Sequence, residues 1–187
     1  AKTEFRKTVR QLFDIDLEIV SLIRTDAGKR EALNQFRDLM VQSNLVSEEI
    51  AKSLKNELKP EEREYYSQML PLHQKLIEEM EQMYSYLYHR QNRFDRRDDI
   101  ILTQFLDNLS DSIRRIRLGY TSRELTPFLE PGKTAKPFGK LEDKLYFNTL
   151  TVQCMESVDK LMVLSSRAGG AVHEREPGNI GGNFPLS

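Results

Sequence analysis

Apolar residues recur at helical spacing from the first residues of the chain. Residues 3–24 are predicted to form a helix, although the stretch FDIDLEIV inside it alternates apolar and acidic residues, a pattern that by itself is typical of a strand. The helical spacing on both sides of that stretch favours the helix. Asp16 lies beside the predicted buried face, where it could pair with an arginine across a bundle. The apolar residues of that face are Phe5, Val9, Leu12, Phe13, Ile19, Val20 and Ile23.

A second helix is expected after Thr25 and Asp26, whose side chains suit an N-cap. The polar stretch SNLVSEE, residues 43–49, predicts a break in this helix. Ser47 would then cap a further piece, with Ile50 as its first buried residue. The buried residues expected before the break are Leu33, Phe36, Leu39 and Met40.

The segment KPEERE carries a clearer start signal. Pro60 fits the first turn of a helix because its missing N–H has no helical partner there, and the glutamates that follow suit the positive end of the helix dipole. Pro71 predicts a kink or a restart of this helix. Beyond it the apolar positions follow a heptad, which packs one helix along another at a shallow angle. These positions are Met69, His73, Leu76, Met80, Met83 and Leu87.

A second heptad follows, out of register with the first. Continuing the first heptad would place Arg90 and Arg97 in core positions, so the helix is expected to end between the two patterns. Residues 92–99, with Asp95 as an N-cap, are therefore predicted to form a tight turn between two antiparallel helices, or else a sharp bend. The second heptad consists of Leu102, Leu106, Leu109, Ile113, Ile116 and Tyr120.

Proline and glycine then mark a long connection over residues 119–140. A loop of this length is either packed down or used for binding. A last helix is predicted over residues 141–166, with an apolar face of Leu145, Phe147, Leu150, Cys154, Val158, Leu161 and Leu164. The whole pattern predicts an all-α fold: an elongated, mostly antiparallel bundle of about five helices in one domain over residues 1–166, with a flexible Gly/Pro-rich tail over residues 167–187.

Composition agrees with this fold. Charged residues make up 30% and apolar residues 39% of the 187 residues, which is too apolar for a disordered chain and typical of amphipathic helices. The net charge of −1 favours neither nucleic acid nor an anionic membrane. The N-terminal stretch AKTEFRK lacks the apolar core of a secretory signal, and no apolar run approaches the ~18 residues that span a bilayer. We therefore expect a soluble, cytoplasmic protein.

The stretch YSYLYHRQNRFDRRDD raises the alternative of a nucleic-acid surface, because aromatics can stack on bases and arginines can bind phosphates. Helix ends explain the same charges, since cations are favoured in last turns and anions in first turns. The two arginine groups would also lie roughly 30 Å apart along one helix. Nucleic acid is thus the less favoured partner, and its candidate contacts are Arg90, Arg93, Arg96, Arg97, Arg114, Arg115 and Arg117.

The chain offers no residue pattern that predicts catalysis, a cofactor or a metal. GKT at residues 132–134 lacks the earlier glycine of a phosphate-binding loop, because Pro127 stands there. His73 and His89 lack the Glu-x-x-His spacing of a di-metal bundle. His73 is expected to be a hydrogen-bonded core residue, with a pH-sensitive switch as the weaker alternative. Cys154 is expected to be a small buried residue, and Asp107, Asp111, Glu78, Glu79 and Glu81 are expected on solvated helix faces.

The favoured function is that of a non-enzymatic interaction module: an adaptor, an assembly subunit or a chaperone-like bundle. Its partners would be other protein chains, a second copy of this chain included, bound through helix seams, the 119–140 loop or the tail. The candidate contact residues are Phe128, Leu129, Phe138 and Phe184. Besides nucleic-acid binding, a ligand-sensing helical domain is a further alternative.

Overall fold

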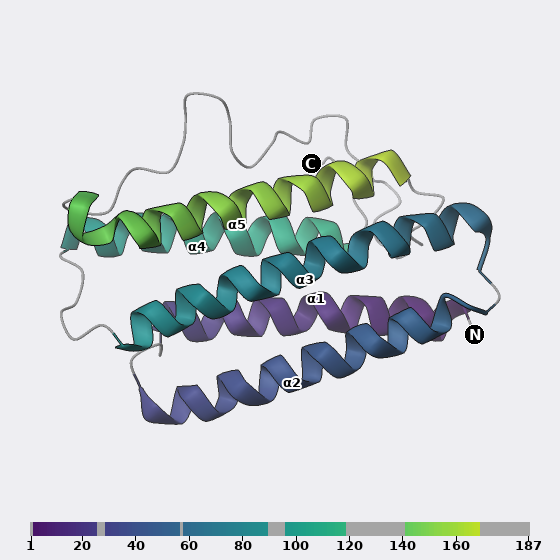
Figure 1. Cartoon of the computed structure of the whole chain (residues 1–187), viewed down its shortest axis with the longest axis horizontal. Coiled ribbons are helices and arrows are strands. Elements are labelled where there is room, and N and C mark those ends of the chain that lie inside the picture. The colour runs from purple at the N-terminus through teal and green to yellow at the C-terminus, as the bar shows by residue number, and fades with distance from the viewer. Residues whose placement is uncertain (1, 26–28, 57, 90–95, 119–140, 169–187) are drawn as a thin grey trace.

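The computed structural model describes residues 2–25, 29–56, 58–89, 96–118 and 141–168, and these form an all-α bundle. The five helices of the described residues lie side by side in an elongated molecule (Figure 1). The prediction of an all-α bundle of about five helices is confirmed. The helices are α1 (Lys2–Thr25), α2 (Arg30–Ser53), α3 (Pro60–His89), α4 (Arg96–Leu118) and α5 (Leu141–Ala168).

Helices that follow each other in the chain are not always neighbours in space. α1 packs closely against α2 and α4, and α3 packs closely against α5, while α4 also contacts α5. Shorter contacts join α1 and α2 to α3. Four helices therefore form a ring in the order α1, α4, α5, α3, and α2 covers the side of the ring where α1 meets α3.

The expected hairpin of α3 and α4 is only partly correct. The two helices run in opposite directions, as Figure 1 shows. Over the described residues, however, their backbones do not approach closely, because α1 and α5 lie between them in the ring. The expected turn around Asp95 lies outside the described residues, as does the expected cap Asp26.

The end of α4 and the start of α5 lie far apart in the bundle. α4 and α5 run parallel, so the end of α4 and the start of α5 lie at opposite ends of the bundle (Figure 1). Residues 119–140 between them and the tail from residue 169 lie outside the described part of the chain.

Two details of the sequence-based helices are wrong. α2 continues through residues 43–49 without a break, with Ser43 and Val46 on its buried side. Leu145, expected on the apolar face of α5, is 54% exposed. Of the two outcomes predicted at Pro71, a kink or a restart, the restart does not occur, because α3 is one helix from Pro60 to His89.

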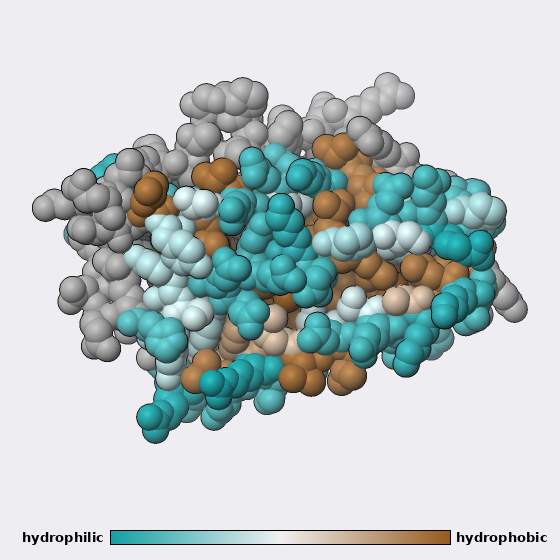
Figure 2. Space-filling model, viewed as in Figure 1, coloured by the Kyte–Doolittle hydropathy of each residue, from teal (hydrophilic) through white to brown (hydrophobic). Residues whose placement is uncertain are grey.

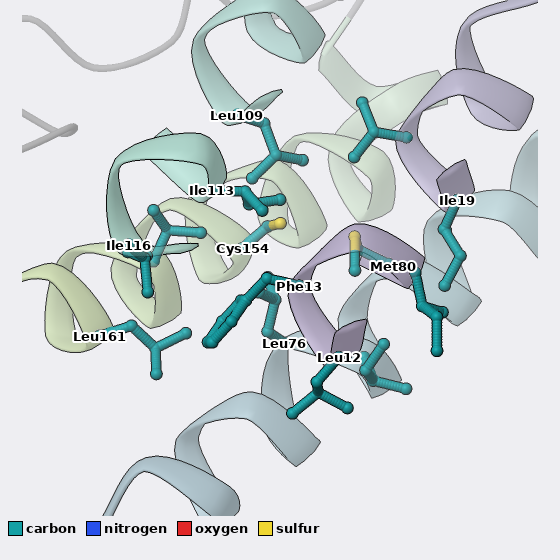
Figure 3. Packing of buried hydrophobic residues seen from close by; sticks show 14 of the residues in the cluster. Leu12, Phe13, Ile19, Leu76, Met80, Leu109, Ile113, Ile116, Cys154 and Leu161 are labelled. Atoms are coloured by element: carbon teal, nitrogen blue, oxygen red, sulfur yellow. The ribbon is translucent and has the colours of Figure 1, made fainter. Parts of the chain in front are cut away.

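The core lies inside the ring of four helices. Figure 3 shows Phe13 of α1 surrounded by side chains of α3, α4 and α5, among them Leu76, Ile113 and Cys154. Almost all the residues predicted from the two heptads and from the first helix are buried there. α1 contacts three other helices, which explains why apolar residues in the stretch FDIDLEIV point to several sides and imitate a strand pattern.

Arg63 fixes the connection between α2 and α3. Its guanidinium donates hydrogen bonds to the backbone carbonyls of Leu54, Asn56 and Leu58 at 2.8, 3.1 and 3.2 Å. These carbonyls follow the last turn of α2, where helical hydrogen-bond partners run out. The predicted start of α3 at Pro60 is confirmed.

Candidate functional site

The residues that the sequence suggested for binding other proteins cannot be placed. Phe128, Leu129, Phe138 and Phe184 lie outside the described residues, and so do Arg90 and Arg93 of the alternative nucleic-acid surface. For these six residues the predictions remain predictions.

The remaining arginines of the nucleic-acid alternative lie at the two ends of α4. Arg96 and Arg97 are exposed in its first turn, and Arg114 and Arg115 are exposed near its end. At a rise of about 1.5 Å per residue, roughly 25–30 Å separate the two groups. They do not form one continuous basic surface.

Several of these charges take part in ion pairs within the bundle. Arg117 is half-buried and donates its hydrogen bonds to both carboxylate oxygens of Asp14 on α1. Arg24 Nη1 lies 2.7 Å from Asp107 Oδ1, which forms a second link between α1 and α4. Arg115 pairs with Asp111 on the exposed side of its own helix. The side chains of Asp107 and Asp111 are both largely exposed, as expected.

The tyrosines of α3 pack on the bundle. Tyr84 is 1% exposed, and its ring stacks on Phe36 of α2 with the centroids 4.1 Å apart and the planes at 3°. The ring of Tyr88 lies 6.2 Å from that of Tyr84, and His89 contacts Tyr88 edge-on. Phe36 therefore covers one face of the Tyr84 ring, and the ring as a whole is too buried to stack on a base.

A second aromatic group joins the same end of α3 to the start of α5. Tyr86 lies 6.0 Å from Tyr146 and 5.1 Å from Phe147, measured between ring centroids. The hydroxyl of Tyr146 donates a hydrogen bond of 3.3 Å to Gln82 Oε1. Tyr146 itself is 55% exposed, beside the exposed Leu145.

Two clefts flank this end of α3. One, of about 460 Å³, lies between α2 and α3 and is lined by Leu33, Phe36, Arg37 and the α3 residues from Glu81 to His89 that face α2. The other, of about 400 Å³, lies between α3 and α5 and includes Tyr86 and Tyr146.

Three exposed residues of α3 line both clefts: Gln82, Ser85 and His89. Their spacing of three and four places them along one stripe of the helix. We call this stripe the α3 ridge. Figure 2 faces this side of the molecule: the surface is mostly hydrophilic, and hydrophobic side chains show along the seams between α2, α3 and α5. The sequence indicated the aromatic residues of α3 but not the contributions of α2 and α5, which are distant in the chain.

A buried hydrogen bond joins α1 to α3 inside the core. His73 Nε2 lies 2.6 Å from Asp16 Oδ2, and both side chains are almost fully buried. The expected core hydrogen bond of His73 is confirmed, whereas the suggested arginine partner of Asp16 is wrong. Burial raises the pKa of Asp16; the charge and hydrogen bond of His73 oppose this rise, and the Asp14 carboxylate adds to it.

Glu79 is a second buried carboxyl, which corrects the prediction of a solvated position. It is 4% exposed, and Ser157 of α5 donates a hydrogen bond of 2.7 Å to Oε1. Burial raises the pKa of Glu79, although the hydrogen bond from Ser157 works against the rise. α3 and α5 are thus joined by a polar contact inside their apolar seam.

Cys154 is fully buried near these two carboxyls. Burial raises the pKa of its thiol well above the usual value, and the charges of Glu79 and Asp16 add to the increase. The thiolate is the nucleophilic form of a cysteine. The environment of Cys154 disfavours that form, in agreement with a packing role.

Comparison of the chain with protein-family models, with curated proteins and with solved structures finds no match. Among the described helices, none is both long and apolar enough to span a membrane. Within the same residues, no three His, Cys, Asp or Glu side chains are arranged to hold a metal ion.

Proposed function

We propose that the protein is a non-enzymatic helical module that binds another polypeptide across the α3 ridge. The observation that carries this proposal is the pair of aromatic-walled clefts on either side of one stripe, Gln82, Ser85 and His89. Tyrosine is enriched among the residues that contribute most to protein interfaces, because it combines a large apolar surface with a polar end. The exposed Tyr146, which lines the second cleft, extends the same surface onto α5.

The geometry favours a helical segment as the occupant. The two clefts lie on opposite sides of one helix, whose diameter with side chains is about 10–12 Å. Two residues seven positions apart on a partner helix are separated by about 10.5 Å along its axis, so one apolar side chain could enter each cleft. The small side chain of Ser85 at the centre of the ridge would allow close approach. We therefore expect an amphipathic helix with two apolar anchors that crosses α3.

The change Ser85→Arg tests this proposal. It places a long charged side chain between the two clefts, and because Ser85 is exposed on a helix we expect the fold to tolerate it. Ser67→Arg is the matched control, since Ser67 is also exposed and precedes Ser85 on the same face of α3 by about five turns. Partners are captured from cells that make the protein, and their affinity for each purified variant is then measured.

We expect Ser85→Arg to weaken binding of the captured protein at least about tenfold, or about 1.4 kcal/mol, and Ser67→Arg to leave it unchanged. Equal binding by both variants and the original protein would contradict the proposed surface. Capture is repeated after nuclease treatment. Partners that disappear with nuclease, and that depend on Arg96, Arg97 and Arg114 in place of Ser85, would support the nucleic-acid alternative.

A further inference from the structure

We propose that the buried Asp16–His73 pair is a proton-dependent lock between α1 and α3, which holds the bundle closed while the pair carries one proton and loosens it when that proton is lost. This inference concerns the core and is independent of the α3 ridge. Its structural basis is the 2.6 Å contact between His73 Nε2 and Asp16 Oδ2, with the exposed fractions of the side chains at only 2% and 0%.

One proton makes the pair electrically neutral. The proton lies either on the imidazole, which gives an imidazolium beside a carboxylate, or on the carboxyl, which gives a carboxylic acid beside a neutral imidazole. Both arrangements supply the hydrogen bond and leave no net charge in the core. Loss of the proton leaves a carboxylate without a counter-charge, and burial of an unpaired charge is costly.

The surroundings of the pair increase this cost. The other Asp16 oxygen, Oδ1, has no hydrogen-bond partner. On α1, Asp14 adds a negative charge, and Arg117 of α4 is bound to Asp14. Cys154 of α5 interacts electrostatically with Asp16 and with Glu79 of α3, and neither Cys154 nor Glu79 is a cation. The buried residues of α2 are uncharged: Ala32, Phe36, Ser43, Val46 and Ile50.

The direction of the pH effect follows from counting protons. In the unfolded chain, aspartate and histidine have pKa values of about 3.9 and 6.5, so above about pH 6.5 the unfolded pair carries no proton. Burial raises the pKa of Asp16, and loss of the pair's proton would leave a buried carboxylate without a counter-charge, so we expect the folded pair to hold this proton more tightly than the unfolded pair. Stability therefore falls as pH rises through this range.

α1 and α3 are the elements that this loss would separate. They approach each other over only a short stretch, and the Asp16–His73 hydrogen bond is a polar link across it. Once Asp16 has lost its proton, contact with water stabilises its carboxylate. Opening of α1 away from α3 supplies that contact, so deprotonation and opening are coupled.

Cys154 provides a reporter for such opening, because it is fully buried and is the one cysteine of the chain. The rate at which 4,4′-dithiodipyridine labels the folded protein is divided by the rate for the denatured chain at the same pH, which corrects for thiol ionisation. The inverse of this ratio is the protection of Cys154. We expect protection to fall at least about tenfold between pH 6 and pH 8.5, because one proton changes an equilibrium by up to tenfold per pH unit.

Two variants locate the effect. Asp16→Asn keeps a hydrogen-bonding group but cannot lose a proton, so its protection should change less than about twofold over the same range. Glu79→Gln removes the other buried carboxyl and should still lose protection as pH rises. Constant protection in the original protein, or an equal loss in Asp16→Asn, would overturn the proposal.

A measurement on the unaltered protein covers the case in which Asp16→Asn fails to fold. The carboxyl carbon of Asp16 is followed by nuclear magnetic resonance as pH is raised. The midpoint of its titration should coincide with the midpoint of the loss of Cys154 protection. Midpoints that differ by more than about one pH unit would show that deprotonation and opening are not coupled, and would likewise overturn the proposal.

Discussion

Replacement of Phe36 by alanine is expected to lower the free energy of unfolding by about 3–5 kcal/mol, the usual cost of removing a buried aromatic ring. Phe36 is 4% exposed and stacks on Tyr84, which is itself buried. Its loss would leave a cavity between α2 and α3 and would also remove a wall of the larger cleft. Chemical denaturation followed by circular dichroism measures the change.

Two further variants test whether the stacked pair is the cause. Phe36→Leu fills much of the volume and should cost clearly less than Phe36→Ala. Tyr88→Ala removes a half-buried ring of the same cluster and should cost less again, because less apolar surface leaves the core. If Tyr88→Ala were as destabilising as Phe36→Ala, the packing at this end of α3 would differ from the arrangement described above.

The second large effect is expected at the buried pair. His73→Leu should lower the free energy of unfolding by about 3–5 kcal/mol at pH 7.5, because it removes one partner and leaves the Asp16 carboxyl buried without its hydrogen bond. The loss should be smaller at pH 5. Burial raises the pKa of Asp16, and a carboxyl with a raised pKa contributes stability at low pH that is lost as pH rises.

Addition of Asp16→Asn to the His73→Leu variant separates charge from packing. At pH 7.5 the double variant should be more stable than His73→Leu alone, because an amide stays neutral. At pH 5 this advantage should largely disappear, since Asp16 can then take up a proton. The free energies of unfolding of the single and double variants at both pH values form a double-mutant cycle. An advantage of equal size at both pH values would show that the charge of Asp16 is not the reason for the loss.

The sequence predicted the helices well where their apolar spacing was regular. Most residues of the heptads that contain Met80 and Ile113 are buried, because a spacing of four and three places residues on one face of a helix whatever covers that face. The start of α3 at Pro60 was equally predictable, since the fixed φ of proline and its missing N–H are local properties.

Polar residues on packed faces were predicted less well. Residues 43–49 suggested a break, yet Ser43 is buried within a continuous α2, and Glu79 is buried although it belongs to an acidic run. A short hydroxyl side chain can be covered without interrupting a helix. Glu79 is accommodated by a hydrogen bond from Ser157, which lies far away in the chain. Local composition carries no information about such a partner.

The sequence by itself determined an all-α chain, most of the helix limits and the apolar face of nearly every helix. Only the tertiary structure decided which helices became neighbours: within the described residues, α3 packs on α5 and not on α4, and α1 contacts three helices. It thereby also decided that Asp16 meets His73 and that two clefts flank Ser85. The physical reason is that residue spacing fixes which side of a helix is apolar, whereas the choice of the helix that covers this side depends on how all the faces of the bundle pack together.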